Sequence, residues 1–343
     1  MCLIRACSDA LVPGLTRRLL LAVLATLASA VAASPAGAAG HSLRTTQRAN
    51  PNTGIVDIYT TLGYSNGVAA GTGMILSHSG EVLTNNHVIR GATAFKVVDV
   101  STHRKYTATV VGYSVSRDVA VLQLAHATRL RTIRLGGPSP LRVGQLVVAR
   151  GNAQGLGGRP KPARGRIVAL HRQIVAKDDS GDSETLTNLI ATNAPVEPGD
   201  SGGPLEDAHN RAIGMVTAGS TSAIHRGFAI TMRQALLVAR QIELGQSSAT
   251  VHVGPTAFIG VGLKTVAGGA EITDVIPGLP ADAAGLVVGD VITSLNGKTV
   301  SSRTDVSQIM VSLVPGTAVS IDWTDTAGLD HTGTITPTSG PPQ

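Results

Sequence analysis

The chain from residue 55 to residue 230 is a succession of short apolar runs separated by Gly, Asn, Asp and Pro. Runs of this length and spacing predict β-strands joined by turns, packed as an antiparallel barrel or sandwich rather than a doubly wound sheet. The predicted strands cover residues 55–61, 71–76, 81–85, 95–100, 105–112, 119–124, 146–150, 165–176, 189–191, 212–217 and 227–230. The composition agrees, because glycine and β-branched residues are abundant and aromatic residues are scarce.

The first clear helical pattern covers residues 232–244. Thr231 can cap its start and Gly245 can end it. Five apolar residues share one face of this predicted helix: Met232, Ala235, Leu236, Ala239 and Ile242. A helix that closes a β-rich region predicts a domain boundary, so residues 41–244 are expected to form one domain and residues 245–252 a linker.

A second, smaller domain is predicted over residues 253–337. Its expected strands cover residues 258–263, 271–275, 290–295, 319–323 and 332–335, with a short helix over 280–284. Ser302-x-x-Asp305 predicts the cap of a second helix, which ends at Pro315-Gly316. At 343 residues the chain is long enough for two such cores. The tail, residues 338–343, is expected to be disordered.

The N-terminal residues 1–38 read as a signal peptide. Arg17-Arg18 precedes an apolar stretch over residues 19–33, and Ala36-Gly37-Ala38 offers a cleavage site. The stretch is shorter than the ~20 residues of a membrane span, so an uncleaved anchor is the less favoured alternative. The only cysteines, Cys2 and Cys7, precede it, so the exported chain is expected to contain no disulfide and no thiolate metal site.

The charge pattern indicates a solvated surface. The formal net charge is +6, from 28 basic and 22 acidic residues. No basic cluster is interleaved with aromatic residues, so nucleic-acid binding is not expected. No H-E-x-x-H or similar spacing occurs, and neither a metal nor another cofactor is expected.

The stretch most indicative of chemistry is the heptapeptide from Pro198 to Pro204, Pro-Gly-Asp-Ser-Gly-Gly-Pro. Gly199 permits a tight turn that can direct the N–H groups of Gly199 and Ser201 to one point beside the Ser201 hydroxyl. Two converging donors beside a nucleophile form an oxyanion hole. A serine hydroxyl needs a base, so this motif predicts a histidine and a carboxylate elsewhere in the chain.

His87 is the best candidate for the base, because it follows a predicted strand and is flanked by small polar residues and by apolar anchors. Asp118 is the best candidate for the carboxylate, because it begins an alternating apolar strand where a charge needs a donor. Asp99 is the second candidate, and Asp57 comes too early to compete with either. The remaining nine histidines are expected to be structural or exposed.

Three stretches occur in the chain order His, Asp, Ser: Thr84-Asn85-Asn86-His87-Val88, Arg117-Asp118-Val119-Ala120-Val121-Leu122 and the heptapeptide from Pro198 to Pro204. Together they resemble the HtrA (Deg) family of trypsin-like serine proteases, and the C-terminal region resembles that family's PDZ domain. The similarity spans nearly the whole exported chain and looks closest to the secreted PepA branch. It implies a mostly β fold, with a chymotrypsin-like double β-barrel followed by a small α+β PDZ domain. It also implies that His87 is the general base, Asp118 its orienting acid, Ser201 the nucleophile, and Gly199 and Ser201 the oxyanion donors.

The resemblance also implies two binding sites. The primary specificity pocket would be formed by Met215, Val216, Thr217, Ala218, Gly219, Gly227 and Phe228, with no acid present to receive Lys or Arg, which favours a small aliphatic residue at the cleaved position. Peptide C-termini would bind a carboxylate loop and a helix of the PDZ domain. The residues expected there are Phe258, Ile259, Gly260, Val261, Val306, Ile309 and Met310.

The sequence departs from many relatives at three places. Asp200 stands where many have Asn, and Asn193 stands where many have Asp; residues 193–195 lie where the family places a loop that switches the oxyanion hole. We expect Asp200 to be held by N–H groups or a basic side chain. The segment over residues 62–68 is too short for the long regulatory loop that locks cage-like hexamers, whereas a homotrimer has family precedent.

The expected function is exported endopeptidase activity on unfolded or misfolded proteins, with the PDZ domain capturing peptide C-termini. One alternative is a chaperone-like, peptide-binding envelope protein whose protease site is inactive at rest. Another is an adhesin or structural protein of the envelope, for which neither hydrolysis nor labelling of Ser201 is expected.

Overall fold

The computed structural model describes residues 50–64, 67–137, 139–177, 183–219 and 227–343. The expected signal peptide, residues 1–38, lies outside these ranges. Within them, no helix combines the length and the apolar character that crossing a bilayer requires.

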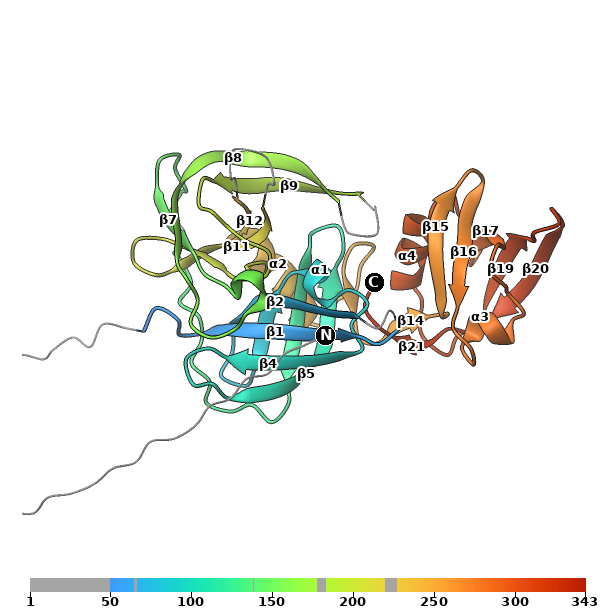
Figure 1. Ribbon diagram of the computed structural model, residues 1–343, viewed down its shortest axis with the longest axis horizontal. Coiled ribbons are helices and arrows are strands. Elements are labelled where there is room, and N and C mark those ends of the chain that lie inside the picture. Colours follow the sequence, from blue (N-terminus) through green and yellow to red (C-terminus); the bar gives the residue numbers. More distant parts are fainter. Residues whose placement is uncertain (1–49, 65–66, 138, 178–182, 220–226) are drawn as a thin grey trace, which may run out of the picture. The chain divides into compact units, whose positions relative to one another are not determined.

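The first part of the described chain forms an antiparallel barrel (Figure 1). Its strands are β1 (Ile55–Leu62), β2 (Gly67–Ile75), β3 (Glu81–Thr84), β4 (Ala94–Asp99), β5 (Lys105–Ser114) and β6 (Val119–Leu124). β5 pairs with both β4 and β6, and these pairings close the ring. A one-turn helix, α1 (Asn86–Ile89), follows β3, and β13 (His252–Val253) pairs with the last part of β5.

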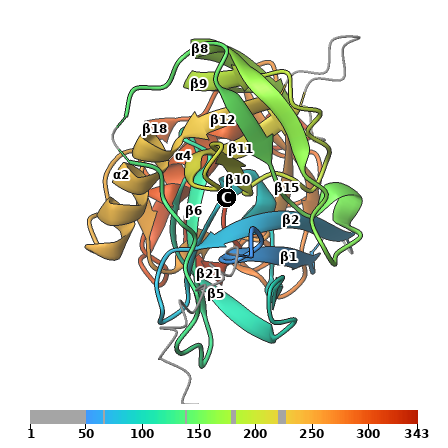
Figure 2. The ribbon, with the colours of Figure 1, turned by 90° about the vertical axis from the view of Figure 1, so that its left-hand side faces the viewer.

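A second closed barrel follows, built from β7 (Leu146–Ala149), β8 (Ala163–Lys177), β9 (Ser183–Thr192), β10 (Pro204–Glu206), β11 (Ala212–Gly219) and β12 (Gly227–Thr231). The short 3-10 helix η1 (Ala153–Gly155) lies between β7 and β8. In two views at right angles, the blue-to-cyan first barrel lies below the green-to-yellow second barrel (Figures 1 and 2). The prediction of a mostly β fold with two barrels is therefore confirmed.

The two barrels share one apolar core with helix α2 (Met232–Glu243). Buried residues of β1, β2 and β6 meet those of β9, β11 and β12 there. The predicted capping of α2 is correct, because the Thr231 hydroxyl accepts the Gln234 N–H at 3.3 Å. The helix buries its apolar face as predicted, except that Val238 is buried and Leu236 only partly so.

The C-terminal region has its own core and sheet. β15 (Val261–Val266), β16 (Gly269–Val275), β17 (Val291–Leu295), β18 (Lys298–Thr299), β19 (Val319–Thr324) and β20 (Asp330–Ile335) form a 6-stranded sheet. The helices α3 (Pro280–Ala283) and α4 (Arg303–Val311) complete this α+β domain. Ser302 caps α4 as predicted, accepting the Asp305 N–H at 3.2 Å.

The tail differs from the prediction. Residues 338–343 were expected to be disordered, but β21 (Thr338–Gly340) pairs with β14 (Thr256–Phe258) in a 2-stranded sheet. Gly340 packs so closely that a methyl group there would lie 2.2 Å from the Phe258 Cβ atom. The sequence does not show this pairing, because it depends on backbone hydrogen bonds rather than on an apolar pattern.

Candidate active site

His87 and Asp118 form a direct pair at the edge of the first barrel. His87 lies in α1, immediately after β3, and Asp118 immediately precedes β6. The His87 ring nitrogen Nδ1 lies 2.9 Å from Asp118 Oδ2, and the His87 backbone N–H donates to Asp118 Oδ1 at 3.0 Å. Because a carboxylate only accepts, Nδ1 carries the proton, which leaves Nε2 as the basic nitrogen of the ring.

Asp118 is held firmly in this position. Its side chain is almost fully buried, and its backbone adopts a φ of 49°, a left-handed conformation that costs about 1 kcal/mol for a residue with a side chain. The Asn85 side chain donates to the Asp118 carbonyl at 2.8 Å, and the Thr217 hydroxyl donates to Asp118 Oδ2. The Thr217 hydroxyl and the two His87 N–H donors satisfy the buried carboxylate, which would otherwise be costly to place there, while Asn85 holds its backbone.

Thr217, on β11 of the second barrel, contacts both Asp118 and Ser201. While its hydroxyl binds Asp118, its carbonyl oxygen accepts the Ser201 hydroxyl at 3.3 Å. The structure therefore gathers His87, Asp118 and Ser201 at the junction of the two barrels. Sequence reasoning placed Thr217 in the specificity pocket and missed this contact, because a threonine within a strand carries no local signal of it.

The loop before β10 presents two unused N–H groups. The N–H groups of Asp200, Gly202 and Gly203 each donate to a carbonyl oxygen, whereas those of Gly199 and Ser201 donate to no acceptor in the part of the chain that the structure describes. Gly199 has a φ of 93°, and a methyl group there would lie 2.1 Å from the Asn152 carbonyl oxygen. This arrangement fits the oxyanion donors predicted from the sequence, and only glycine fits the turn.

Two of the residues predicted to line the specificity pocket are buried elsewhere in the structure. The side chains of Met215 and Val216 are buried in the apolar cores, so they do not form its walls. The register of β11 with β12 instead pairs Ala218 with Phe228 and Gly219 with Gly227. Met215 and Val216 point to opposite faces of β11, and both faces are covered there by apolar cores, whereas a register shift between Val216 and Ala218 separates them from the end of the strand.

Val196 lies against the two glycines and was not predicted. Methyl groups placed at Gly219 and Gly227 would lie 3.4 Å and 2.9 Å from Val196 Cγ2. The side chain of Val196 therefore borders the space that these glycines leave open. No motif marks this residue, since its contact with Gly219 and Gly227 depends on the fold and not on the neighbouring sequence.

The loop that begins at Asn193 and leads to Val196 is hydrogen-bonded to β8. The Asn193 side-chain oxygen accepts the Arg166 N–H at 2.7 Å, and the Asn193 N–H donates to the Arg166 carbonyl at 3.2 Å. Gly165 permits this approach, because a methyl group there would lie 2.4 Å from the Ala194 nitrogen. Asn193 thus fixes the start of the loop that leads to Val196 and Ser201.

The second candidate carboxylate, Asp99, has a local role. Its Oδ1 atom accepts the Ser101 N–H and the Ser101 hydroxyl, both at 2.8 Å, and so stabilises the turn after β4. This use of Asp99 favours Asp118 as the partner of His87.

Asp200 is buried beside the catalytic loop. Its Oδ2 atom accepts the Glu197 N–H at 3.0 Å, as expected of a carboxylate held by an N–H group, and its Oδ1 atom is buried with no hydrogen-bond partner. Burial raises the pKa of Asp200 to about 6, and burial likewise raises the pKa of Asp57, on β1, to about 6.

Asp200→Asn is expected to raise stability at neutral pH while leaving activity within about threefold of the wild type. Because the folded pKa lies above the unfolded value, Asp200 weakens the folded state progressively as the pH rises from about 4 to about 6. The wild type and Asp200→Asn should have equal free energies of unfolding at pH 4. At pH 7.5 the free energy of unfolding of the variant should be higher by up to about 3 kcal/mol. Urea unfolding across this pH range measures the difference, and a destabilised variant at pH 7.5 would contradict it.

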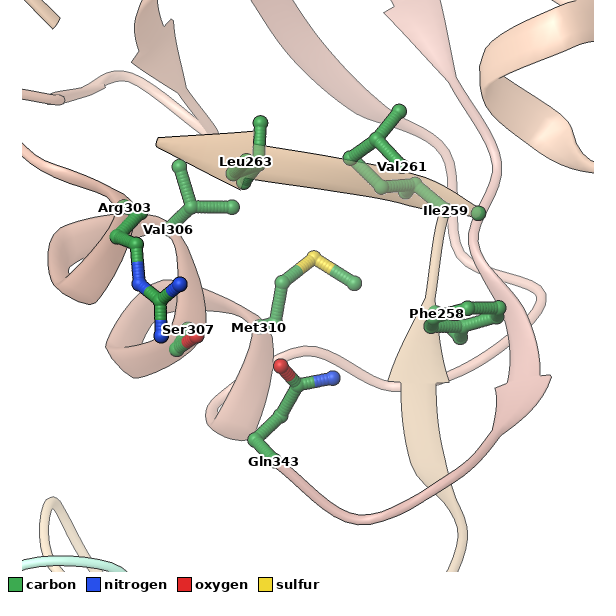
Figure 3. Close-up of a pocket in the computed structure, with 10 residues that line it drawn as sticks. Phe258, Ile259, Val261, Leu263, Arg303, Val306, Ser307, Met310 and Gln343 are labelled. Atoms are coloured by element: carbon green, nitrogen blue, oxygen red, sulfur yellow. The ribbon is translucent and has the colours of Figure 1, made fainter. Parts of the chain in front are cut away.

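A groove lies between β15 and α4 of the C-terminal domain (Figure 3). Its volume is about 160 Å³, room for one apolar side chain. Six of the predicted residues line it: Phe258, Ile259, Gly260, Val261, Val306 and Met310. The N–H groups of Ile259 and Gly260 donate to no acceptor among the described residues, as a carboxylate-binding loop requires.

Ile309 was also predicted to face the last side chain of the peptide, but it is not among the residues that line this groove. Along a helix, Val306 and Met310 are four residues apart and share one face, whereas Ile309 points elsewhere. Leu263, Arg303, Ser307 and Gln343 also border the groove and were not predicted.

Two antiparallel barrels, a His–Asp pair on one of them, and a serine with two unused N–H groups on the other define a trypsin-like serine peptidase. Residues 71–215 match the trypsin-like peptidase domain, and residues 257–324 match the PDZ domain. The class expected from the sequence is therefore confirmed, and the chain combines one peptidase domain with one PDZ domain.

Proteins with similar sequences and structures indicate which trypsin-like peptidases are related to this chain. The chain is 31% identical over 288 residues to the serine protease PepD of Mycobacterium tuberculosis, covering 78% of this chain and 60% of PepD. It is 35% identical over 251 residues to the periplasmic serine endoprotease DegP of Escherichia coli, covering 68% of this chain and 50% of DegP. The solved HtrA-type protease AlgW with a tripeptide aligns with a TM-score of 0.50 and 29% identity over 86% of this chain and 96% of that one.

The chain is therefore a trypsin-like peptidase with one PDZ domain, homologous to serine proteases of the HtrA and DegP type. It spans about half the length of the curated relatives that it matches. Its placement in the secreted PepA branch stays a prediction.

Proposed function

We propose that this chain is an exported serine endopeptidase that cleaves unfolded or misfolded proteins through an acyl-enzyme. The observation that supports this proposal most is the contact of Thr217 with both Asp118 and Ser201, since it joins the groups of a Ser-His-Asp triad across two barrels. The described residues hold no group of His, Cys, Asp and Glu side chains suited to a metal ion, and the proposed reaction needs none.

In the first half of the reaction, the Ser201 hydroxyl turns from the Thr217 carbonyl toward His87 Nε2. Ser201 Oγ attacks the scissile carbonyl carbon while its proton passes to Nε2, and the carbonyl oxygen becomes an oxyanion. The N–H groups of Gly199 and Ser201 stabilise this oxyanion. Asp118 stabilises the imidazolium, which protonates the amine nitrogen as the oxyanion collapses and the C–N bond breaks, so that the acyl group remains on Ser201 Oγ as an ester.

In the second half, a water molecule gives a proton to His87 Nε2 and attacks the ester carbonyl of the acylated Ser201. The same two N–H groups stabilise the second oxyanion. Collapse of this intermediate breaks the ester bond, and His87 returns the proton to Ser201 Oγ, which restores the free enzyme.

The proposed preference at the cleaved position is for a small aliphatic side chain. Gly219 and Gly227 are paired across β11 and β12 and carry no side chains, and the apolar side chain of Val196 lies against both of them. Val196, Ala218 and Phe228 are uncharged, so none of them could pair with a Lys or Arg of the substrate.

Val196→Ala is expected to change this preference. Removing two methyl groups deepens the pocket, so kcat/KM for a substrate with Leu or Met at the cleaved position should rise about tenfold relative to one with Val. Two peptides that differ only at this position, assayed with both enzymes, measure the change. An unchanged ratio would show that Val196 does not limit the pocket.

The PDZ domain is proposed to bind the C-termini of substrate peptides. The unused N–H groups of Ile259 and Gly260 would hold the terminal carboxylate, and the groove beside Val306 and Met310 would take the last side chain. An envelope or secreted location is supported by the predicted signal peptide and by the periplasmic relatives. A homotrimer is proposed by analogy with the family.

The alternative is a chaperone-like protein whose protease site rests in an inactive state. The Ser201 hydroxyl, which donates to the Thr217 carbonyl, is the observation that favours it. Cleavage of casein separates the two functions. The endopeptidase should degrade casein, and Ser201→Ala should not, whereas a resting chaperone should suppress casein aggregation without cutting it.

A further inference from the structure

Thr72 connects the first barrel to the catalytic loop of the second. It lies on β2 and is fully buried. Its hydroxyl accepts the Asn152 N–H at 2.8 Å and donates to the Gly199 carbonyl oxygen at 2.7 Å. Both capacities of this hydroxyl are therefore used for loops of the second barrel.

The backbone of Thr72 contacts the same loop. Its N–H donates to the Ser201 carbonyl oxygen at 2.8 Å, and its own carbonyl accepts the Thr84 hydroxyl at 2.7 Å. One residue therefore holds the carbonyl oxygens on both sides of the Asp200–Ser201 peptide.

The Gly199 N–H belongs to the Pro198–Gly199 peptide, so its direction depends on the Pro198 carbonyl rather than on the carbonyl of Gly199 or Ser201. A trans peptide is planar, so fixing a carbonyl oxygen also fixes the following N–H in the opposite direction. The Pro198 carbonyl accepts the Gln154 N–H at 2.6 Å, which directs the Gly199 N–H away from η1. Gln154 follows Asn152 within two residues, and Asn152 is itself held by the Thr72 hydroxyl.

The surroundings of Thr72 leave little space for movement. A methyl group placed at Gly151 would lie 2.7 Å from Thr72 Oγ1, and one at Gly202 would lie 2.0 Å from the Thr72 carbonyl oxygen. A methyl group at Gly203 would lie 3.2 Å from Thr72 Cγ2. Such close packing keeps the hydroxyl between its two partners.

We propose that Thr72 is a positioning residue for the oxyanion site, acting through its hydroxyl on the Gly199 carbonyl and on the loop that begins at Asn152. It touches no reacting atom. Its hydroxyl fixes the turn at Gly199, so that the two unused N–H groups face the developing oxyanion before substrate binds. This inference rests on the proposed peptidase function.

Thr72→Val keeps the shape of the side chain and removes the hydroxyl. In the full chain it should lower kcat about 10- to 100-fold, less than the loss of a whole oxyanion donor, while KM changes by less than about twofold. The rate of fluorophosphonate labelling at Ser201 should fall in parallel. Thr72→Ser, which keeps the hydroxyl, should restore kcat to within about threefold of the wild type.

Thr60→Val is the matched control. Thr60 is buried on the neighbouring strand β1, and its hydroxyl donates to the Ala69 carbonyl at 3.4 Å. This variant loses a buried hydroxyl of the same barrel without touching the catalytic loop, so its melting temperature should fall while its kcat stays at the wild-type value.

Thr72→Ala and Thr72→Ser differ by one hydroxyl and decide the question if Thr72→Val does not fold. Equal kcat values for these two variants would overturn the proposal, as would a fall in kcat for Thr60→Val equal to that for Thr72→Val. A wild-type chain that neither hydrolyses casein nor becomes labelled would overturn the peptidase function itself, and with it this role.

Discussion

Asp118→Asn is expected to lower kcat about 10⁴-fold with little change in KM. The Asn side chain would present an N–H donor to His87 Nδ1 in place of a carboxylate oxygen. The imidazole would then adopt the other tautomer, with its proton on Nε2, and could not accept the proton of Ser201. Steady-state hydrolysis of a peptide substrate from pH 6 to pH 10 measures this loss.

Asp99→Asn is the matched control for that experiment. Asp99 is also buried and was the second candidate from the sequence, but its carboxylate serves the turn at Ser101. This variant should lose stability and keep its kcat. A 10⁴-fold loss in Asp99→Asn, with full activity in Asp118→Asn, would reverse the assignment of the acid.

Gly199→Ala is the second substitution with a large expected effect. Its methyl group would lie 2.1 Å from the Asn152 carbonyl oxygen, and its φ of 93° is unfavourable for alanine. The loop must therefore shift, which removes the Gly199 N–H from the oxyanion site and should lower kcat about 10²- to 10³-fold. Active-site titration at 25 °C gives the concentration of folded, active enzyme, and steady-state kinetics then give kcat for that fraction.

Gly144→Ala controls for backbone strain. Gly144 has a φ of 86°, and a methyl group there would meet nothing within 4 Å. This variant should lose about 1 kcal/mol of stability and keep its kcat. If Gly144→Ala and Gly199→Ala lowered kcat alike, the loss could not be assigned to the oxyanion site.

The catalytic groups could be predicted from the sequence because each lies in a local pattern. The Gly-Asp-Ser-Gly-Gly run predicts a tight turn at a nucleophile, and Asp118 precedes a strand of alternating apolar residues. By contrast, Thr72, Thr217 and Val196 act through partners far away in the chain. A buried threonine in a strand looks alike in sequence whether its hydroxyl serves the site or a neighbouring carbonyl.

The strands were predicted where one face is apolar, and were missed where backbone pairing alone forms them. β9 was predicted over three residues, but it covers Ser183–Thr192, because β8 supplies a partner for its polar part. β10 begins at Pro204 and was not predicted, since it pairs with β7 and β11 from within the catalytic loop. β14 and β21 lacked any apolar alternation that could reveal them.

The site at which a fluorophosphonate reacts with the full chain tests the proposed triad most directly. Peptide mass spectrometry should find one adduct, on Ser201, and the labelling should disappear in Ser201→Ala and slow strongly in His87→Ala. Unlabelled wild-type protein, or an adduct on another serine with Ser201→Ala still reactive, would contradict the claim that His87, Asp118 and Ser201 form a working triad.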